Sequence, residues 1–175
     1  MNLKYKIFLS FFILCFNLLC ATAGVFEHEV NLKDVSAKLP ELNSIDCKFA
    51  QEKQIPQAKM ILKSSGDFKF VKNQGITFYT IYPIKSVTSY NAKEYRQINN
   101  IINAISAKSY TRLERDFKFY YTGNTNCWTL GLLPRKESPV FNYLKSIEIT
   151  GNESMILNMM ILSADSTRTK IRFFF

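Results

Sequence analysis

The chain has 175 residues, of which 47% are apolar, 14% aromatic and 21% charged. That length is enough for one globular domain but short for two, and the apolar content excludes a disordered chain. The formal net charge of +9 favours contact with anionic membranes or acidic partners, although a basic solvated surface accounts for it equally well.

The first 23 residues have the pattern of a removable secretion signal. Lys4 and Lys6 precede an apolar run over residues 7–19, and Ala21-Thr22-Ala23 has the small-x-small pattern of a cleavage site. We therefore predict cleavage after Ala23 and a periplasmic location. An exported chain that lacks a basic-aromatic motif is not expected to bind nucleic acid.

Two alternatives compete with cleavage. The segment could remain as an uncleaved anchor, but its apolar run is shorter than the roughly 20 residues that span a bilayer. Cys20 could instead carry a lipid, but lipid attachment usually requires a small preceding residue, and here that residue is Leu19. Residues 24–175 are therefore expected to form a single mature domain.

The mature chain contains two cysteines, Cys47 and Cys127. An oxidising compartment would permit one disulfide between them, although the sequence does not establish that they lie close enough. The pair is a candidate disulfide whose formation is left open.

The mature chain begins with a helical pattern and then changes to strands. Residues 28–45 place apolar side chains near one face of a helix, which Pro40 limits or breaks. Alternating residues then predict strands over 47–55, 60–73 and 76–83. Residues 73–75 are turn residues, so the second and third of these strands should form a hairpin.

A second helical pattern interrupts the strands at residues 93–107. Its apolar residues recur at three- and four-residue steps, the spacing of an amphipathic helix, and they are Tyr95, Ile98, Ile101, Ile102 and Ile105. A short helical segment with Leu113 follows. This helical pair could cover a sheet face as a lid or be ordinary packing helices, and the pattern alone does not decide between the two.

Strand patterns resume after these helices, over residues 116–123, 126–134, 138–151, 154–164 and 166–175. The turn residues between them favour antiparallel neighbours. We therefore predict a mainly β chain of the α+β class, in which a curved antiparallel sheet has helices on one side.

The sequence contains no recognisable catalytic signature. His28 is the only histidine, and there is no G-x-S-x-G motif, no glycine-rich phosphate loop and no Cys/His cluster with metal spacing. We expect a non-enzymatic protein without metal or cofactor, whose function depends on an apolar cavity. An enzyme of unrecognised type is the alternative.

Several short stretches occur in a characteristic order. They are Phe49-Ala50-Gln51, Ser64-Ser65-Gly66, the aromatic strand from Phe78-Tyr79 to Tyr82-Pro83, the segment LERDFKFYYTGNTNCWTLGLLPRKESPVFNYLKSIEITG, and Thr169 to Phe173. Their order and spacing resemble the LolA-like family, the periplasmic outer-membrane lipoprotein carriers and their relatives. The resemblance covers residues 47–175, and none of its motifs is catalytic.

The resemblance implies an unclosed β-barrel whose concave apolar face is covered by a helical lid. It also implies a monomeric carrier that takes an acyl chain from an inner-membrane exporter to an outer-membrane acceptor. Well-studied carriers have an Arg-Pro pair where this chain has Lys72-Asn73, and family members commonly have tryptophan at the position of Phe78. A lysine lacks the fixed donor fork of arginine. The cargo therefore need not be a lipoprotein and could be another lipid or glycolipid.

We predict that the acyl chain contacts the concave face and that the isoleucine-bearing helix is the lid. The ligand-face residues are Phe49, Phe68, Phe70, Phe78, Tyr82, Trp128, Leu130, Ile147 and Met159, and the lid residues are Tyr95, Ile98, Ile101, Ile102 and Ile105. Ordinary core packing is the alternative interpretation for each of them.

Two other functions remain alternatives to the carrier. One is a sensing module of the same fold that recognises lipid or lipoprotein and signals to a partner. The other is a small outer-membrane barrel, which the aromatic terminal residue Phe175 favours but the amphipathic helix at 93–107 does not.

Overall fold

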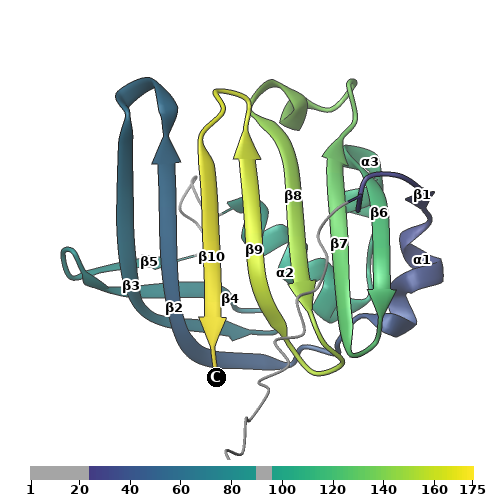
Figure 1. Cartoon of the computed structure of the whole chain (residues 1–175). Helices are drawn as coiled ribbons and strands as arrows, with labels where there is room; N and C mark the ends of the chain where they lie inside the picture. The colour runs from purple at the N-terminus through teal and green to yellow at the C-terminus, as the bar shows by residue number, and fades with distance from the viewer. Residues whose placement is uncertain (1–23, 90–95) are drawn as a thin grey trace, which may run out of the picture.

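The computed structural model describes residues 24–89 and 96–175 (Figure 1). Its strands are β1 (Glu29–Val30), β2 (Ser44–Ile55), β3 (Met60–Val71), β4 (Gly75–Tyr82), β5 (Ser86–Ser89), β6 (Phe117–Asn124), β7 (Cys127–Pro134), β8 (Leu144–Gly151), β9 (Ile156–Ser163) and β10 (Arg168–Phe174). Its α-helices are α1 (Leu32–Val35), α2 (Arg96–Ala107) and α3 (Thr111–Asp116), and single 3-10 turns lie at Ser36–Lys38, Pro56–Ala58 and Pro139–Asn142.

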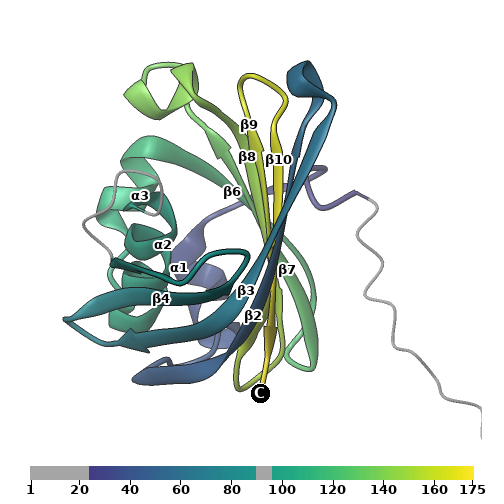
Figure 2. The same cartoon turned by 90° about the vertical axis from the view of Figure 1, so that its left-hand side faces the viewer.

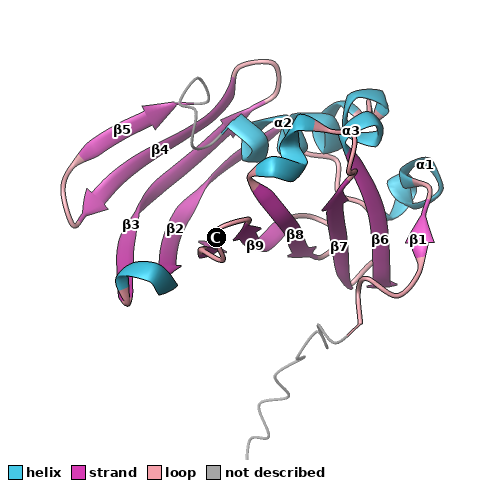
Figure 3. Ribbon diagram, turned by 90° about the horizontal axis from the view of Figure 1, so that it is seen from above, coloured by secondary structure: helices cyan, strands magenta, loops and turns pink. Residues whose placement is uncertain are grey.

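The strands of the described residues form a single antiparallel sheet in the order β1-β6-β7-β8-β9-β10-β2-β3-β4-β5. The last strand, β10, pairs with both β9 and β2 and so joins the two halves of the sheet (Figure 1). The sheet curves without closing, and the helices lie on its concave side (Figures 2 and 3). The predicted curved antiparallel sheet of the α+β class with helices on one side is therefore confirmed.

Side-chain alternation makes the two faces of the sheet different. In β2, Ile45, Cys47 and Phe49 are buried, whereas the residues between them are exposed. Successive strand residues point to opposite faces, so these three mark the inner, concave face. Beyond Phe49 the β2 residues are only half-buried, and the inner-face residue Leu62 of β3 is exposed. The core therefore occupies one end of the concave face and leaves the other end open.

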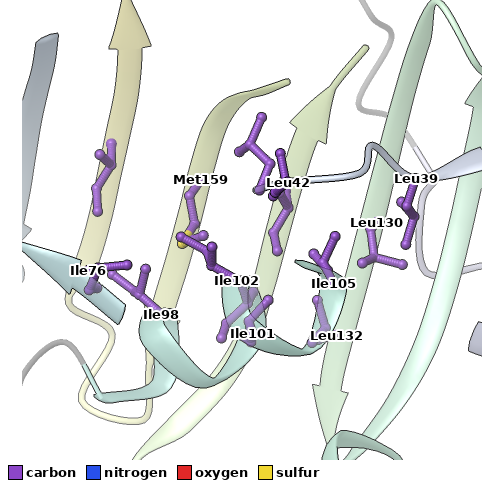
Figure 4. Packing of buried hydrophobic residues seen from close by; sticks show 14 of the residues in the cluster. Leu39, Leu42, Ile76, Ile98, Ile101, Ile102, Ile105, Leu130, Leu132 and Met159 are labelled. Carbon is purple, nitrogen blue, oxygen red and sulfur yellow. The ribbon is translucent and has the colours of Figure 1, made fainter. Parts of the chain in front are cut away.

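The covered end is filled by interlocking aromatic and aliphatic side chains. The ring centroid of Phe78 lies 5.0 Å from that of Phe49 and 4.9 Å from that of Phe68. Helix α2 crosses the strands and directs four isoleucines toward them, each at most 2% exposed: Ile98, Ile101, Ile102 and Ile105 (Figure 4). Burial of one such side chain is worth about 1.5–3 kcal/mol, so this apolar face is the main interaction holding α2 on the sheet.

The helix or broken helix predicted over residues 28–45 is confirmed only in part. Leu32–Val35 is α-helical and Ser36–Lys38 continues it as a 3-10 turn that ends before Pro40, whereas the unpredicted strand β1 pairs with β6. The Asn31 side chain begins α1 by accepting a hydrogen bond from the Lys33 N–H at 2.9 Å. The apolar residues that led to the prediction are all buried: Leu32, Val35, Leu39 and Leu42. Their spacing therefore identified buried positions but not the backbone conformation.

The candidate disulfide between Cys47 and Cys127 does not form, because Cys47 is a free, buried thiol. Cys47 lies on β2 and Cys127 begins β7, and strands β8, β9 and β10 lie between these two. At about 4.8 Å per strand the separation along the sheet is about 19 Å. A disulfide requires Cα atoms within about 7 Å, so the pairing is geometrically impossible.

The buried position of Cys47 has a measurable consequence. Desolvation raises the pKa of its thiol to about 11, so the reactive thiolate is scarce at neutral pH. We expect no reaction of Cys47 with a disulfide reagent in the folded protein and full reaction after unfolding in guanidinium. Labelled peptides identified by mass spectrometry provide the measurement, with Cys47→Ala as the control. Rapid labelling of Cys47 in the folded protein would contradict its burial.

Candidate functional site

Eight of the nine predicted ligand-face residues lie on the concave side of the sheet and are at most 3% exposed. They are Phe49, Phe68, Phe70, Phe78, Trp128, Leu130, Ile147 and Met159. All eight belong to the hydrophobic core that the helices cover. Packing therefore accounts for most of them, whereas Ile147 also lines an open pocket.

Tyr82 does not lie on the concave face, and its predicted position is wrong. A register shift between β3 and β4 places Tyr82 opposite Ser65. Ser65 pairs with Ala50, which is next to the inward-facing Phe49 and so points outward. Tyr82 is 60% exposed and lines a hollow with the outward-facing Arg172. A shift of one residue in register moves a side chain to the other face of a sheet, which the alternation pattern alone does not reveal.

The predicted lid helix corresponds to α2. Its isoleucines all face the concave side of the sheet, where Ile98 lies beside Ile76 of β4, and Ile105 lies over β7 near Leu132 (Figure 4). Tyr95, the remaining predicted lid residue, lies outside the described residues. The described part of this helix is thus a cover over the core.

A pocket of about 690 Å³ opens where α2 begins. Helix α2 contributes one side of it, β8 and β9 contribute the floor, and the segment before β8 contributes the rim. Its lining residues are Arg96, Gln97, Ile98, Tyr143, Leu144, Ile147, Ile161 and Ser163. The floor is apolar, and the polar groups lie at the rim. This arrangement is typical of sites that hold an apolar ligand with a polar end.

Among the described residues, one side-chain hydrogen bond crosses the rim of this pocket. The Gln97 amide Nε2 donates to the Tyr143 hydroxyl at 2.8 Å. Tyr143 is 50% exposed, so the bond is accessible to water. Its net contribution is therefore small, about 0.5–1.5 kcal/mol.

The other end of α2 has several polar contacts with the N-terminal segment. The Ser106 hydroxyl donates to the Leu42 carbonyl oxygen, and both groups are buried. The Lys108 ammonium donates to the carbonyl oxygens of Ser36 and Leu39, at 2.9 Å in each case. Burial lowers the pKa of Lys108, and the nearby charge of Glu41 opposes that shift. The start of α2 also has a buried contact, because the Asn99 side-chain oxygen accepts from the Ile76 N–H at 3.2 Å. Among the described residues, the last turn of α2 thus has more polar contacts than the first.

The open end of the concave face continues beyond the pocket along β2 and β3. Paired inner-face residues there are Gln51 with Ser64, Lys53 with Leu62, and Ile55 with Met60. The Gln51 side-chain oxygen is buried and has no hydrogen-bond partner in the part of the chain that the structure describes. An unpartnered acceptor of this kind costs about 1–3 kcal/mol, and a ligand donor would recover that cost.

Six lining residues of the pocket were absent from the sequence-based prediction, namely Arg96, Gln97, Tyr143, Leu144, Ile161 and Ser163. Gln97 and Arg96 belong to the polar side of the amphipathic helix, and Tyr143 precedes a strand. Leu144 and Ile161 belong to predicted strands but have no feature that separates them from ordinary core residues. A pocket forms where elements distant in sequence meet, so no local pattern indicated it.

Residues 24–89 and 96–175 contain no group of three or more His, Cys, Asp and Glu side chains placed to hold a metal ion. Within the same ranges, no helix has the length and apolarity needed to cross a membrane. Comparison with known proteins found no matching family model and no matching curated protein.

Proposed function

We propose that the protein is a periplasmic carrier that shields an acyl chain in the pocket under the start of α2. The observation that supports this most directly is an apolar floor formed by β8 and β9, opposite Ile98 of α2, in a space of about 690 Å³. Small-molecule sites in proteins have volumes of about 300–1,000 Å³. The size and lining of the pocket therefore suit one hydrocarbon chain with its polar end at the rim.

The physical chemistry of transfer supports the same class of ligand. Each methylene removed from water contributes about 0.8 kcal/mol, so a long acyl chain binds firmly even without specific polar contacts. At the rim, Arg96 and Gln97 offer hydrogen-bond donors to the ester, amide or phosphate that ends such a chain. The buried Gln51 oxygen offers an acceptor further along the concave face.

The unequal fastening of α2 supports reversible binding. Ser106 and Lys108 tie its last turns to the N-terminal segment. At its start, Gln97 has one exposed hydrogen bond to Tyr143, and the Asn99 side-chain oxygen accepts one buried hydrogen bond from the Ile76 N–H. The first turn has fewer described polar contacts than the last, so we propose that the start of the helix lifts more readily than its end, which breaks the contacts of Gln97 and Asn99. Such a movement would enlarge the pocket and admit or release the chain, so α2 acts as a lid hinged at its C-terminal end.

The direction of transfer, from an inner-membrane exporter to an outer-membrane acceptor, is proposed from the LolA-like resemblance. Lys72-Asn73 replaces the Arg-Pro pair of that family, so we include other lipids and glycolipids as cargo along with lipoproteins. A sensing module that binds the same ligand without transferring it is the second proposal. Transfer of a fluorescent lipid between two vesicle populations separates the two.

Filling the pocket should prevent acyl binding. Ile161 is half-buried on the pocket floor, and Ile161→Trp would place an indole where the chain lies. We expect the affinity for a fluorescent fatty-acyl probe to fall about tenfold or more. The matched control is Val71→Trp, on the outer face of β3, where the side chain is 40% exposed and away from the pocket. Equal affinities of the two folded variants would contradict the assignment of the pocket.

Removing the rim hydrogen bond should change the rate of exchange. Tyr143→Phe keeps the ring but deletes the hydroxyl that accepts from Gln97. Because this bond joins the start of the lid to the rim of the pocket, we expect probe release to accelerate by about two- to tenfold. Stopped-flow displacement of the probe measures the release rate, and Tyr121→Phe is the control because its hydroxyl lacks a described partner. An unchanged release rate in Tyr143→Phe would contradict a role of this hydrogen bond in closing the lid.

A further inference from the structure

Three successive apolar residues are exposed at the end of the hairpin formed by β2 and β3. They are Met60, Ile61 and Leu62, with exposures of 48%, 56% and 47%. A run of this kind is unusual on a protein surface unless it contacts something. The hairpin ends at the same edge of the sheet as the β9–β10 turn (Figure 1). The Gln57 amide donates to the Asp165 carbonyl oxygen and so ties the hairpin end to that turn.

The apolar residues of the hairpin end lie on both faces of the sheet. Leu62 pairs with Lys53 and Met60 with Ile55, all on the concave side, whereas Ile61 pairs with Gln54 on the outer side. A partner protein that binds in a groove or adds a strand contacts the side chains on one face of a strand. A lipid bilayer surrounds an inserted hairpin end on both faces. The distribution therefore fits a bilayer better than a protein groove.

A second element presents aromatic residues at the same edge. The segment before β8 contains Phe141, 46% exposed, and Tyr143, 50% exposed. Figure 1 places this segment, with its 3-10 turn, beside the β9–β10 turn at the upper edge of the sheet. Aromatic side chains with a polar group are favoured at the boundary between lipid headgroups and acyl chains. Two separate parts of the edge thus have the residues that such a boundary accepts.

The same edge carries excess positive charge. Its three segments are residues 52–63, 135–145 and 163–170. The basic residues are Lys53, Lys59, Lys63, Arg135, Lys136, Lys145, Arg168 and Lys170, and the acidic residues are Glu52, Glu137 and Asp165. Eight positive against three negative charges give a formal net charge of +5 from these segments, out of +9 for the chain. A basic edge of this kind is attracted to anionic lipid headgroups.

We propose that this edge, which we call the docking edge, binds the surface of an anionic phospholipid bilayer. The side chains of Met60, Ile61 and Leu62 enter the headgroup region, and the surrounding lysines and arginines contact the phosphates. The mouth of the pocket, with Tyr143 and Ser163 on its rim, lies at the same edge. Docking therefore brings the pocket to the lipid surface. The binding itself needs no cargo, so it goes beyond the proposed carrier function and can be tested separately.

The test is vesicle flotation with protein purified from the periplasm of an expressing bacterium. One vesicle population is pure phosphatidylcholine, and in the other about one third of the lipid is phosphatidylglycerol. The test variant is Ile61→Ser with Leu62→Ser. The matched control is Phe174→Ser with Phe175→Ser, which removes side chains that are 47% and 60% exposed at the opposite edge of the sheet (Figure 1). Circular dichroism and protection of Cys47 from labelling verify that both variants are folded.

We expect the wild-type protein and the control to float with the anionic vesicles and to be released by high salt, because the lysines act through charge. The hairpin variant should bind these vesicles about tenfold more weakly. Equal flotation of the hairpin variant and the control would overturn the proposal, as would a wild-type protein that floats with neither population. Flotation is measured without an acyl probe, so its failure leaves the pocket assignment intact, and loss of probe binding leaves the docking edge intact.

Discussion

Four isoleucines of α2 rest on the inner face of the sheet, and the rest of the structure depends on this contact. Without α2, the apolar residues on the inner face of the curved sheet would be exposed to water. That exposure costs about 25 cal/mol per Å² of apolar surface. Helix α2 crosses the strands, so it covers a band about 10 Å wide. Strands β8 and β9 have eight residues each, a length of about 26 Å. One helix cannot cover the whole face, and the pocket occupies part of what is left.

The polar contacts of α2 decide which end of it can move. Two donors hold the last turns. The buried Ser106 hydroxyl donates to one carbonyl oxygen, and the Lys108 ammonium donates to two. At the start of the helix, the hydrogen bond from Gln97 to Tyr143 is exposed, and a buried one joins the Ile76 N–H to the Asn99 side-chain oxygen. Water competes for exposed hydrogen bonds more effectively than for buried ones, so the Gln97 bond is weak and the start of α2 has fewer strong polar contacts than its end. The proposed lid movement and the location of the pocket follow from the same asymmetry.

The sheet and the amphipathic helix could be predicted from the sequence because their apolar residues recur at regular spacing. In α2, for example, isoleucines recur at three- and four-residue steps from Ile98 to Ile105. The sequence-based prediction failed where tertiary packing overrides the spacing of apolar residues, or where the pairing register of two strands shifts. Leu32, Val35, Leu39 and Leu42 are all buried, but only the first two lie in the α-helix, and the register shift beside Ser65 turns Tyr82 outward. Strand β5 has four residues and gave no detectable pattern. Most predicted ligand-face residues are core, since a filled core and a ligand cavity require the same apolar side chains.

The measurement that tests the carrier proposal most directly is native mass spectrometry of protein isolated gently from the periplasm, followed by lipid extraction. The account predicts one acyl-bearing molecule per chain, which dissociates on activation and is identified in the extract. Protein that is entirely free of lipid, and that also fails to take up a fatty-acyl probe, would contradict the account. The pocket at the start of α2 would then be a gap in the packing rather than a binding site.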